Sequence, residues 1–274
     1  MIYDLHIHSN KSDGKYDRFK IIKHLIDNKF EYASFTDHNY ISNLGVYNSF
    51  IKNYKDANLK LINGIEFDVQ DIKFMHILGY GIKNLQNVSE VIKYIEIENI
   101  EICKRLILNL KEKYNFDICF DEIKSNYKQI SKGSIRDLLV KKGYADNHLV
   151  AGNLYTGKNS YCYEQTKSLT YEKVINLIKS NGGISVLAHP STLNLEDDKL
   201  IEFVSSLKEM GLDGIEVLNT SKTTNRDFDL YREIAFKLDL LESCGSDFHR
   251  ERYNQNIGID NEISKKLIYK LEEG

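Results

Sequence analysis

Short β-type segments alternate with helical segments along most of this chain, and this alternation constrains its fold more than any other feature. The β-type segments are rich in Ile, Val, Leu, Phe and Tyr, whereas the helical segments repeat apolar residues every three or four positions. Such alternation is typical of an α/β protein. Seven segments have the β-type pattern: IYDLHIH (2–8), YASFTDH (32–38), LKLINGIEF (59–67), IKFMHILGY (72–80), GGISVLAHP (182–190), LDGIEVLN (212–219) and DLLESCGSDFH (239–249).

One long helical stretch interrupts this alternation between the fourth and fifth β-type segments. Residues 88–113 repeat apolar residues at helical spacing and predict one long helix. Three shorter helical segments follow, at 121–127, 134–142 and 146–155. We therefore predict a discontinuous α/β domain over 1–95 and 168–274, with a helical insertion over 96–167.

The first β-type segment contains two histidines, His6 and His8, separated by one residue. Residues i and i+2 of a strand point to the same face, so the two imidazoles are expected to lie side by side. Neutral imidazole is a good ligand for Zn, Fe or Mn. The alternative is a pair of histidines on a solvated strand, and these two residues alone do not decide between the two interpretations.

Six of the eight histidines lie in or at the ends of predicted strands: His6, His8, His38, His76, His189 and His249. Carboxylates occupy neighbouring positions, namely Asp13, Asp37, Glu66 and Asp247. Active sites of parallel barrels form at the carboxyl ends of the strands, where side chains far apart in sequence converge. Imidazoles and carboxylates are poor core residues without partners, and clustered carboxylates need a compensating cation. The pattern predicts a metal centre, which becomes a multinuclear one when taken together with the family resemblance given below, whereas His24 and His148 are interpreted as ordinary helix histidines.

The composition is that of an ordinary globular protein, with 42% hydrophobic and 28% charged residues in 274. A net charge of −3 does not favour a general nucleic-acid binder, and no apolar run approaches the roughly 20 residues of a membrane span. The four cysteines are widely spaced, and we interpret them as reduced thiols. With no secretory leader apparent, we expect a cytoplasmic protein.

The β-type segments and their neighbours resemble the PHP family, the polymerase-and-histidinol-phosphatase metallohydrolases. The matching segments are DLHIHSNKSDG, FTDHN, NGIEFD, MHILGYG, GGISVLAHPS, DGIEVLN and GSDFH. Each is a weak motif alone, but their combination and order are specific. The resemblance implies a distorted (β/α)7 barrel with a helical cap, which agrees with the seven predicted strands.

The resemblance also implies three divalent metal ions, and every implied position holds a competent ligand. One ion would take His6, His8, Glu66 and Asp247. A second would share Glu66 and add His76 and His189. The third would take Asp13, His38 and His249. Mn, Fe and Zn all suit such ligands, so the identity of the metal stays open.

The insertion resembles the cap of bacterial members that act on nucleotide and RNA phosphates, namely 3′,5′-nucleotide bisphosphatases and 5′-to-3′ exoribonucleases. The chain departs from that pattern where Lys132, Gly133 and Ser134 replace an Arg-Pro-His segment and Asp137 replaces an arginine. Fixed positive charge suits a phosphate. The substrate-binding candidates are Lys132, Arg136 and Arg250, with Ser134 as a neutral donor. The alternative for each cation is an ordinary solvated surface charge.

The chemistry implied is hydrolysis of a phosphate ester by metal-activated hydroxide. Asp37 is a candidate acceptor that orients an imidazole, with a strand-end turn as its alternative. Asp247 and His249 are candidate proton relays to the leaving oxygen as well as ligands.

We expect a small phosphorylated substrate, either a nucleoside 3′,5′-bisphosphate or a short 5′-phosphorylated RNA, and no membrane or stable nucleic-acid complex. The alternatives are a histidinol-phosphate phosphatase and a metal-binding module without activity. The cap argues against the first, and the complete ligand set argues against the second.

Overall fold

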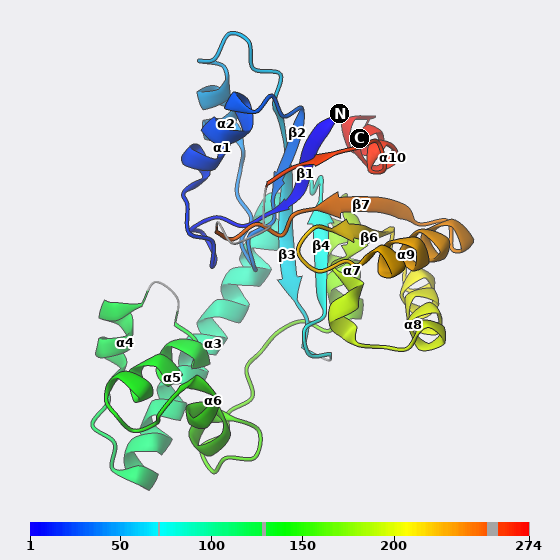
Figure 1. Cartoon of the computed structure of the whole chain (residues 1–274). Coiled ribbons are helices and arrows are strands. Elements are labelled where there is room, and N and C mark those ends of the chain that lie inside the picture. Colours follow the sequence, from blue (N-terminus) through cyan, green and yellow to red (C-terminus); the bar gives the residue numbers. More distant parts are fainter. Residues whose placement is uncertain (71, 128–129, 251–256, 274) are drawn as a thin grey trace. The chain divides into compact units, whose positions relative to one another are not determined.

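The computed structural model describes residues 1–70, 72–127, 130–250 and 257–273 (Figure 1). The chain forms two compact units. Met1–Glu90 and Leu169–Gly274 form one of them, which we call the barrel unit, and Val91–Ser168 form the other, which we call the helical unit.

One mixed sheet, eight-stranded over the described residues, forms the barrel unit in the order β7-β6-β5-β4-β3-β2-β1-β8. Its strands are β1 (Ile2–Ile7), β2 (Tyr32–Phe35), β3 (Lys60–Asp68), β4 (His76–Tyr80), β5 (Ile184–Leu187), β6 (Gly214–Asn219), β7 (Leu241–Gly245) and β8 (Ile259–Asp260). The main-chain N–H of Asp247, just after β7, donates to His6 O at 2.8 Å, so the sheet nearly closes into a barrel. The predicted α/β barrel is confirmed, and the short strand β8 was not predicted.

Strand β4 runs antiparallel to both of its neighbours, β3 and β5. It begins at His76, four residues later than the predicted segment, and Asp68 at the end of β3 pairs with His76. The amino end of a reversed strand lies beside the carboxyl ends of its neighbours. His76 therefore lies at the same rim as Glu66, although it opens its own strand.

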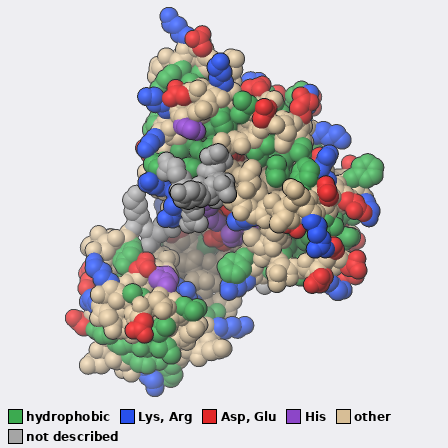
Figure 2. Space-filling view, viewed as in Figure 1, with side chains coloured by type: hydrophobic (Ala, Val, Ile, Leu, Met, Phe, Trp, Pro, Cys, Tyr) green, Lys and Arg blue, Asp and Glu red, His purple; other side chains and the backbone are tan. Residues whose placement is uncertain are grey.

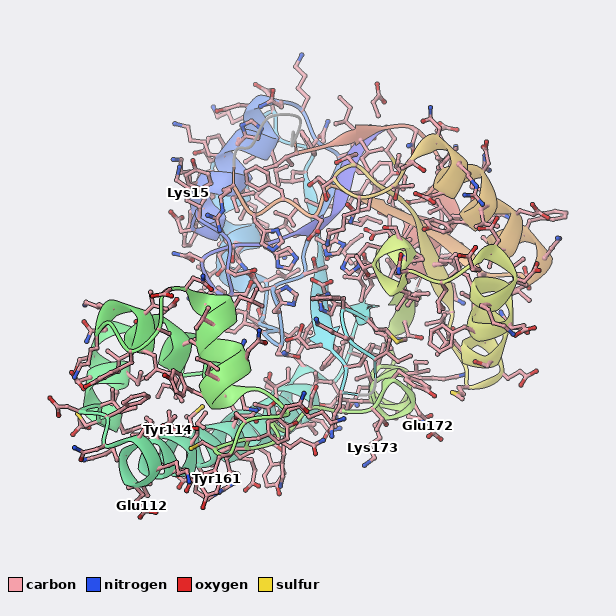
Figure 3. The ribbon with its side chains drawn as sticks, turned by 60° about the horizontal axis from the view of Figure 1, so that its bottom comes forward. Lys15, Glu112, Tyr114, Tyr161, Glu172 and Lys173 are labelled. Atoms are coloured by element: carbon pink, nitrogen blue, oxygen red, sulfur yellow. The ribbon has the colours of Figure 1, made fainter. Side chains whose placement is uncertain are left out.

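Helices pack against the outer face of this sheet (Figure 1). They are α1 (Arg18–Asp27), α2 (Gly45–Ile51), α7 (Tyr171–Ser180), α8 (Asp197–Glu209), α9 (Asn225–Lys237) and α10 (Lys265–Glu273), with the short 3₁₀ turn η2 (Pro190–Leu193) after β5. On α7, Val174, Ile175 and Ile178 form a buried apolar stripe, whereas Glu172 and Lys173 point outward (Figure 3).

The helical unit has its own core. Its elements are α3 (Leu85–Tyr114), whose first residues belong to the barrel unit, α4 (Phe120–Asn126), α5 (Lys132–Lys141), α6 (His148–Ala151) and the π-helix η1 (Gly152–Thr156). Leu106, Leu110 and Leu139 are buried in this core. Tyr114 (Figure 3) packs edge-on against Tyr155, with ring centroids 5.0 Å apart.

Positive and negative side chains are interspersed over the face of the molecule shown in Figure 2. This mixture fits the small net charge of −3. Among the described residues, no helix combines the length and the apolar character that crossing a membrane requires.

Candidate metal centre

The rim of the barrel unit gathers all nine side chains implied as metal ligands. His6 and His8 come from β1 and the residue after it, and Glu66 comes from β3. Their candidate ligand atoms form overlapping groups in which all atoms lie within 4.8 Å of one another. We describe these groups as a first, a second and a third position.

The first position is formed by His6, His8, Glu66 and Asp247, all buried. His8 Nε2 lies 3.0 Å from Glu66 Oε2 and 3.2 Å from Asp247 Oδ1. His6 Nε2 lies 3.3 Å and 3.4 Å from the same two oxygens. Four ligand atoms thus converge on one small volume.

Several atoms at the first position fit a metal ion better than they fit one another. His6 Nε2, His8 Nε2 and Glu66 Oε2 are buried without a hydrogen-bond partner among the described residues. Such orphaned polar atoms are costly in a protein interior. An ion with bonds of about 2.0–2.1 Å separates tetrahedral ligands by about 3.4 Å, which is close to the spacing found here.

The second position is formed by Glu66, His76 and His189. Glu66 Oε1 lies 2.8 Å from His76 Nδ1 and 2.9 Å from His189 Nε2. The two oxygens of Glu66 therefore face different positions. A carboxylate arranged in this way can bridge two ions.

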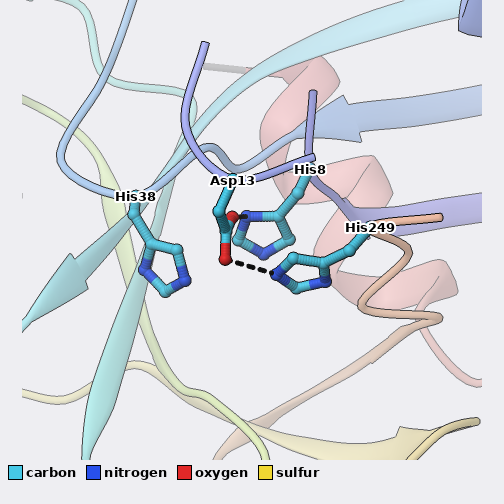
Figure 4. Close-up of side chains that lie close together, drawn as sticks. All are labelled: His8, Asp13, His38 and His249. Carbon is cyan, nitrogen blue, oxygen red and sulfur yellow. Dashed lines mark ion pairs between the residues drawn. The ribbon is translucent and has the colours of Figure 1, made fainter. Parts of the chain in front are cut away.

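The third position is formed by His8, Asp13, His38 and His249 (Figure 4). Asp13 lies between two imidazoles, with Oδ2 3.2 Å from His249 Nε2 and Oδ1 3.5 Å from His8 Nδ1 (Figure 4). His249 Nδ1 lies 2.8 Å from the main-chain oxygen of Asp247 and can donate to it. That bond leaves Nε2 of His249 available for a metal.

Asp68 is a further carboxylate at this rim that the sequence analysis missed. Its Oδ1 lies 2.9 Å from His38 Nδ1 and 3.4 Å from His76 Nε2, and the three residues form a fourth group able to hold a metal ion. Asn39 Nδ2 donates to Asp68 Oδ2 at 2.8 Å. Because Asp68 follows Glu66 by two residues on β3, strand alternation could have identified it.

Glu216 in β6 is a second missed carboxylate, and it is fully buried. Its Oε1 accepts from His6 Nδ1 at 2.9 Å, which directs Nε2 of His6 toward the first position. Its Oε2 accepts from the main-chain N–H of His189 at 2.7 Å. One carboxylate thus orients side chains of two positions.

Two of the implied ligands have strained backbones. His189 has a φ of 26° and Asp247 a φ of 55°, both in the left-handed region that non-glycine residues rarely adopt. Strain of this kind persists where surrounding contacts fix it, and it gathers at functional sites. The bond from His189 N–H to Glu216 is one such contact.

Asp37 has other partners than the imidazole we predicted. It is fully buried, and its carboxylate accepts from Ser9 N at 2.7 Å, from Ser12 Oγ at 2.8 Å and from Arg18 Nη2 at 2.7 Å. Burial opposes its ionisation, but the Arg18 guanidinium holds the pKa of its carboxyl below the usual range. Asp37 therefore fixes the loop after β1, which carries Asp13.

Without metal, imidazoles and carboxylates at the rim shift one another's pKa values in the directions that favour charge. Burial disfavours charge on His6, but Glu216 and Glu66 raise its pKa well above the ordinary value. Burial also disfavours charge on His38, but Glu66 raises its pKa to about 10. Burial likewise opposes the charge on Glu66, but His38 and His6 hold the pKa of its carboxyl well below its usual range. A metal ion, which binds neutral imidazole, would displace these protons.

Three of the four predicted substrate-binding residues lie on α5 in the helical unit. Ser134 is buried, and its hydroxyl donates to Ser131 O at 2.7 Å, so it serves the helix cap and not the predicted donor role. Arg136 Nε donates to Thr156 Oγ1 at 2.7 Å, and Lys132 lies over the ring of Tyr163.

The fourth predicted residue, Arg250, is exposed and follows His249 in the barrel unit. In the helical unit Asp137, which stands where an arginine was expected, forms an ion pair with His148.

The fold and the rim together define an α/β-barrel protein with a candidate multinuclear metal centre. The PHP domain family matches residues 4–189, more than half of the chain, and the chain belongs to this family.

Its relatives include a 5′-3′ exoribonuclease of Haemophilus influenzae, 25% identical over 90% of this chain and 89% of that protein. A 3′,5′-nucleoside bisphosphate phosphatase of Chromobacterium violaceum is 26% identical over 90% of this chain and 86% of its own. Among solved structures, an amidohydrolase from Chromobacterium violaceum, with bound sulfate and no metal, has the same fold. Its TM-score is 0.73 at 23% identity, and the match covers 99% of this chain and 96% of that one.

Proposed function

We propose that this protein is a metal-dependent phosphohydrolase of the cytoplasm that acts on nucleoside 3′,5′-bisphosphates or short 5′-phosphorylated RNA. The observation that carries the proposal is the convergence of four buried side chains, those of His6, His8, Glu66 and Asp247. Three of the converging atoms, His6 Nε2, His8 Nε2 and Glu66 Oε2, lack hydrogen-bond partners among the described residues. The relatives support the substrate class, since two of them are named for exoribonuclease and nucleotide bisphosphatase activity.

The implied ions would be held by the three positions. His6, His8, Glu66 and Asp247 would hold the first, Glu66, His76 and His189 the second, and Asp13, His38 and His249 the third. Bound divalent ions would supply Lewis acidity, which neutralises phosphoryl oxygens and lowers the pKa of water. Asp68 lies within reach of His38 and His76 and would add negative charge between the second and third positions.

The protein's own groups prepare this site before any ion binds. Glu216 fixes which nitrogen of His6 faces the first position, and the main-chain oxygen of Asp247 does the same for His249. The carboxylate of Asp247 has contacts on both oxygens, with His8 on Oδ1 and Lys222 on Oδ2. We therefore assign Asp247 and His249 to metal binding in preference to proton relay. Lys132, Arg136 and Arg250 stay proposed phosphate contacts.

A direct test compares the wild-type protein, loaded with Mn²⁺, with the variant His8→Ala. We expect the wild type to hydrolyse p-nitrophenyl phosphate and His8→Ala to lose at least about 100-fold in kcat/KM, as expected when a metal ligand is removed. Circular dichroism should show that the variant is folded. His24→Ala, which removes an exposed histidine of α1, is the matched control and should keep full activity.

A substrate panel then separates the proposed class from its alternatives. We expect turnover of adenosine 3′,5′-bisphosphate or of a 5′-phosphorylated oligoribonucleotide to exceed that of histidinol phosphate. Preference for histidinol phosphate would contradict the proposed substrate class. A wild-type protein with full metal content and no turnover of any ester would contradict the catalytic function itself.

A further inference from the structure

Lys222 is a cation at the edge of the metal centre that neither the motifs nor the implied ligand sets include. It lies in the loop between β6 and α9, and its ammonium forms an ion pair with Asp247 Oδ2. Its side chain is one-third exposed, whereas Asp247 is only 4% exposed. The ammonium group therefore connects a buried ligand carboxylate to the solvent side of the rim.

The loop that carries Lys222 is held by its own hydrogen bonds. Asn219 is fully buried, and its main-chain oxygen accepts from Lys222 N at 3.1 Å and from Thr223 N at 2.9 Å. Asn219 Oδ1 accepts from Ser221 Oγ at 2.7 Å, and Thr220 N donates to Gly245 O at 3.1 Å. The position of Lys222 thus follows from the ends of β6 and β7 and does not depend on its side chain alone.

Asp247 separates Lys222 from the ligand nitrogens. Its Oδ1 faces His6 and His8 at 3.4 Å and 3.2 Å, whereas its Oδ2 faces Lys222. The ammonium therefore lies beside the first position without occupying it. An ion at that position and the lysine could be present together.

The chemistry of lysine indicates what such a group can bind. An ammonium has three N–H donors, and the ion pair with Asp247 engages one side of the group. Its partial exposure leaves the remaining donors open to an incoming ligand. A compact positive charge beside divalent ions suits a phosphoryl oxygen, for which lysine is a common ligand in proteins.

We propose that Lys222 binds a non-bridging oxygen of the substrate phosphoryl group and so provides a phosphate contact within the barrel unit itself. This inference rests on the proposed phosphohydrolase function and adds a residue to the substrate contacts. The simpler role, neutralisation of Asp247 alone, makes a different prediction, because it would act on metal binding and not on phosphate.

The test uses the Mn²⁺-loaded full chain and the variants Lys222→Ala, Lys222→Gln and Lys222→Arg. We expect the dissociation constant of inorganic phosphate, measured by calorimetry, to rise roughly 10- to 100-fold in Lys222→Ala and Lys222→Gln, the effect of one hydrogen bond to a charged group. The value of kcat/KM for adenosine 3′,5′-bisphosphate should fall by a similar factor, and Lys222→Arg should recover much of both losses. Metal content should stay at the wild-type level. Lys237→Ala, which removes an exposed ion pair of α9, is the control.

Three outcomes would overturn the proposal. The first is unchanged phosphate affinity in Lys222→Ala at full metal content. The second is loss of phosphate affinity only in proportion to lost metal, which would limit Lys222 to support of Asp247. The third is a loaded wild type that binds no phosphate. A wild type that binds phosphate but hydrolyses no ester contradicts the proposed function alone, since the phosphate titration still tests Lys222.

Discussion

Some side chains of the rim are candidate metal ligands, and others hold these ligand side chains in place. Nine side chains of the first kind were predicted, because histidines and carboxylates at strand ends are conspicuous and the family resemblance implies them as ligands; Asp68 was missed. The sequence pattern also missed Glu216, which lies on β6 and contacts His6 of β1 and the residue His189 after β5, although β1 is not a neighbour of β6 in the sheet. It also left Asp37 as either an acceptor for an imidazole or a strand-end turn residue, and the carboxylate accepts from Ser9, Ser12 and Arg18. A local sequence pattern does not reveal contacts of this kind between residues that lie far apart in the sequence.

Glu216 supports a prediction at this scale. In Glu216→Gln one amide oxygen remains, so the side chain can no longer accept both from His6 Nδ1 and, through its second oxygen, from His189 N. We expect the Mn²⁺ affinity to fall about 10- to 100-fold, as for other residues that orient metal ligands. Metal titration of the apoprotein measures this. Glu242→Gln on β7, which loses an ion pair with Arg232, should bind metal normally. Equal affinities in the two variants would contradict the positioning role.

Strands and helices were predicted with their types largely correct, and the errors have physical causes. The pattern of 72–80 is as apolar as a parallel strand and does not reveal that β4 runs in reverse, because direction is decided by the short connection to β3. The helices α2 and α10 and the strand β8 were not predicted. Strand β8 has two residues, too few to show an alternation, and it forms by pairing with β1.

The contact between β7 and β1 gives a prediction for these elements. Gly245 ends β7, and a Cβ atom there would lie 2.2 Å from His6 Cβ. We expect Gly245→Ala to lower the free energy of unfolding by about 1–3 kcal/mol, the usual cost of overpacking, and to weaken metal binding because β1 must move. Urea denaturation and metal titration measure the two effects.

Gly133→Ala is the control for this substitution, because its Cβ would face only Ser131 Oγ, at 3.2 Å, near the start of α5. Alanine favours a helix, so stability should be unchanged or higher. Wild-type stability in Gly245→Ala would show that β7 and β1 can separate without cost.

At the scale of the whole molecule, the cluster of imidazoles makes the free energy of unfolding depend on both pH and metal binding. Without metal, the pKa values of His6, His8 and His38 are raised, that of His38 to about 10. A raised pKa in the folded state gives stability that is complete below the ordinary histidine value of about 6.5 and is lost as pH rises toward the folded value. The apoprotein should therefore lose stability above pH 6.5. Metal binding, which needs neutral imidazoles, strengthens over the same range.

We thus expect the difference in melting temperature between the Mn²⁺-loaded and chelator-treated protein to grow from pH 6.5 to pH 9. Thermal unfolding with and without chelator measures this difference. His8→Ala, treated in the same way, is expected to show a smaller difference with a weaker dependence on pH. A difference that stays constant or shrinks with rising pH would contradict the linkage.

The two-sided arrangement of Glu66 has a consequence for how the centre fills. One side chain serves two neighbouring positions, Oε2 toward His8 and Oε1 toward His76. An ion held at one position would keep Glu66 ionised and turned toward the other position, so filling one position would favour filling the next. Loading should therefore be cooperative, and at limiting metal the population should divide into empty and doubly loaded molecules with few in between.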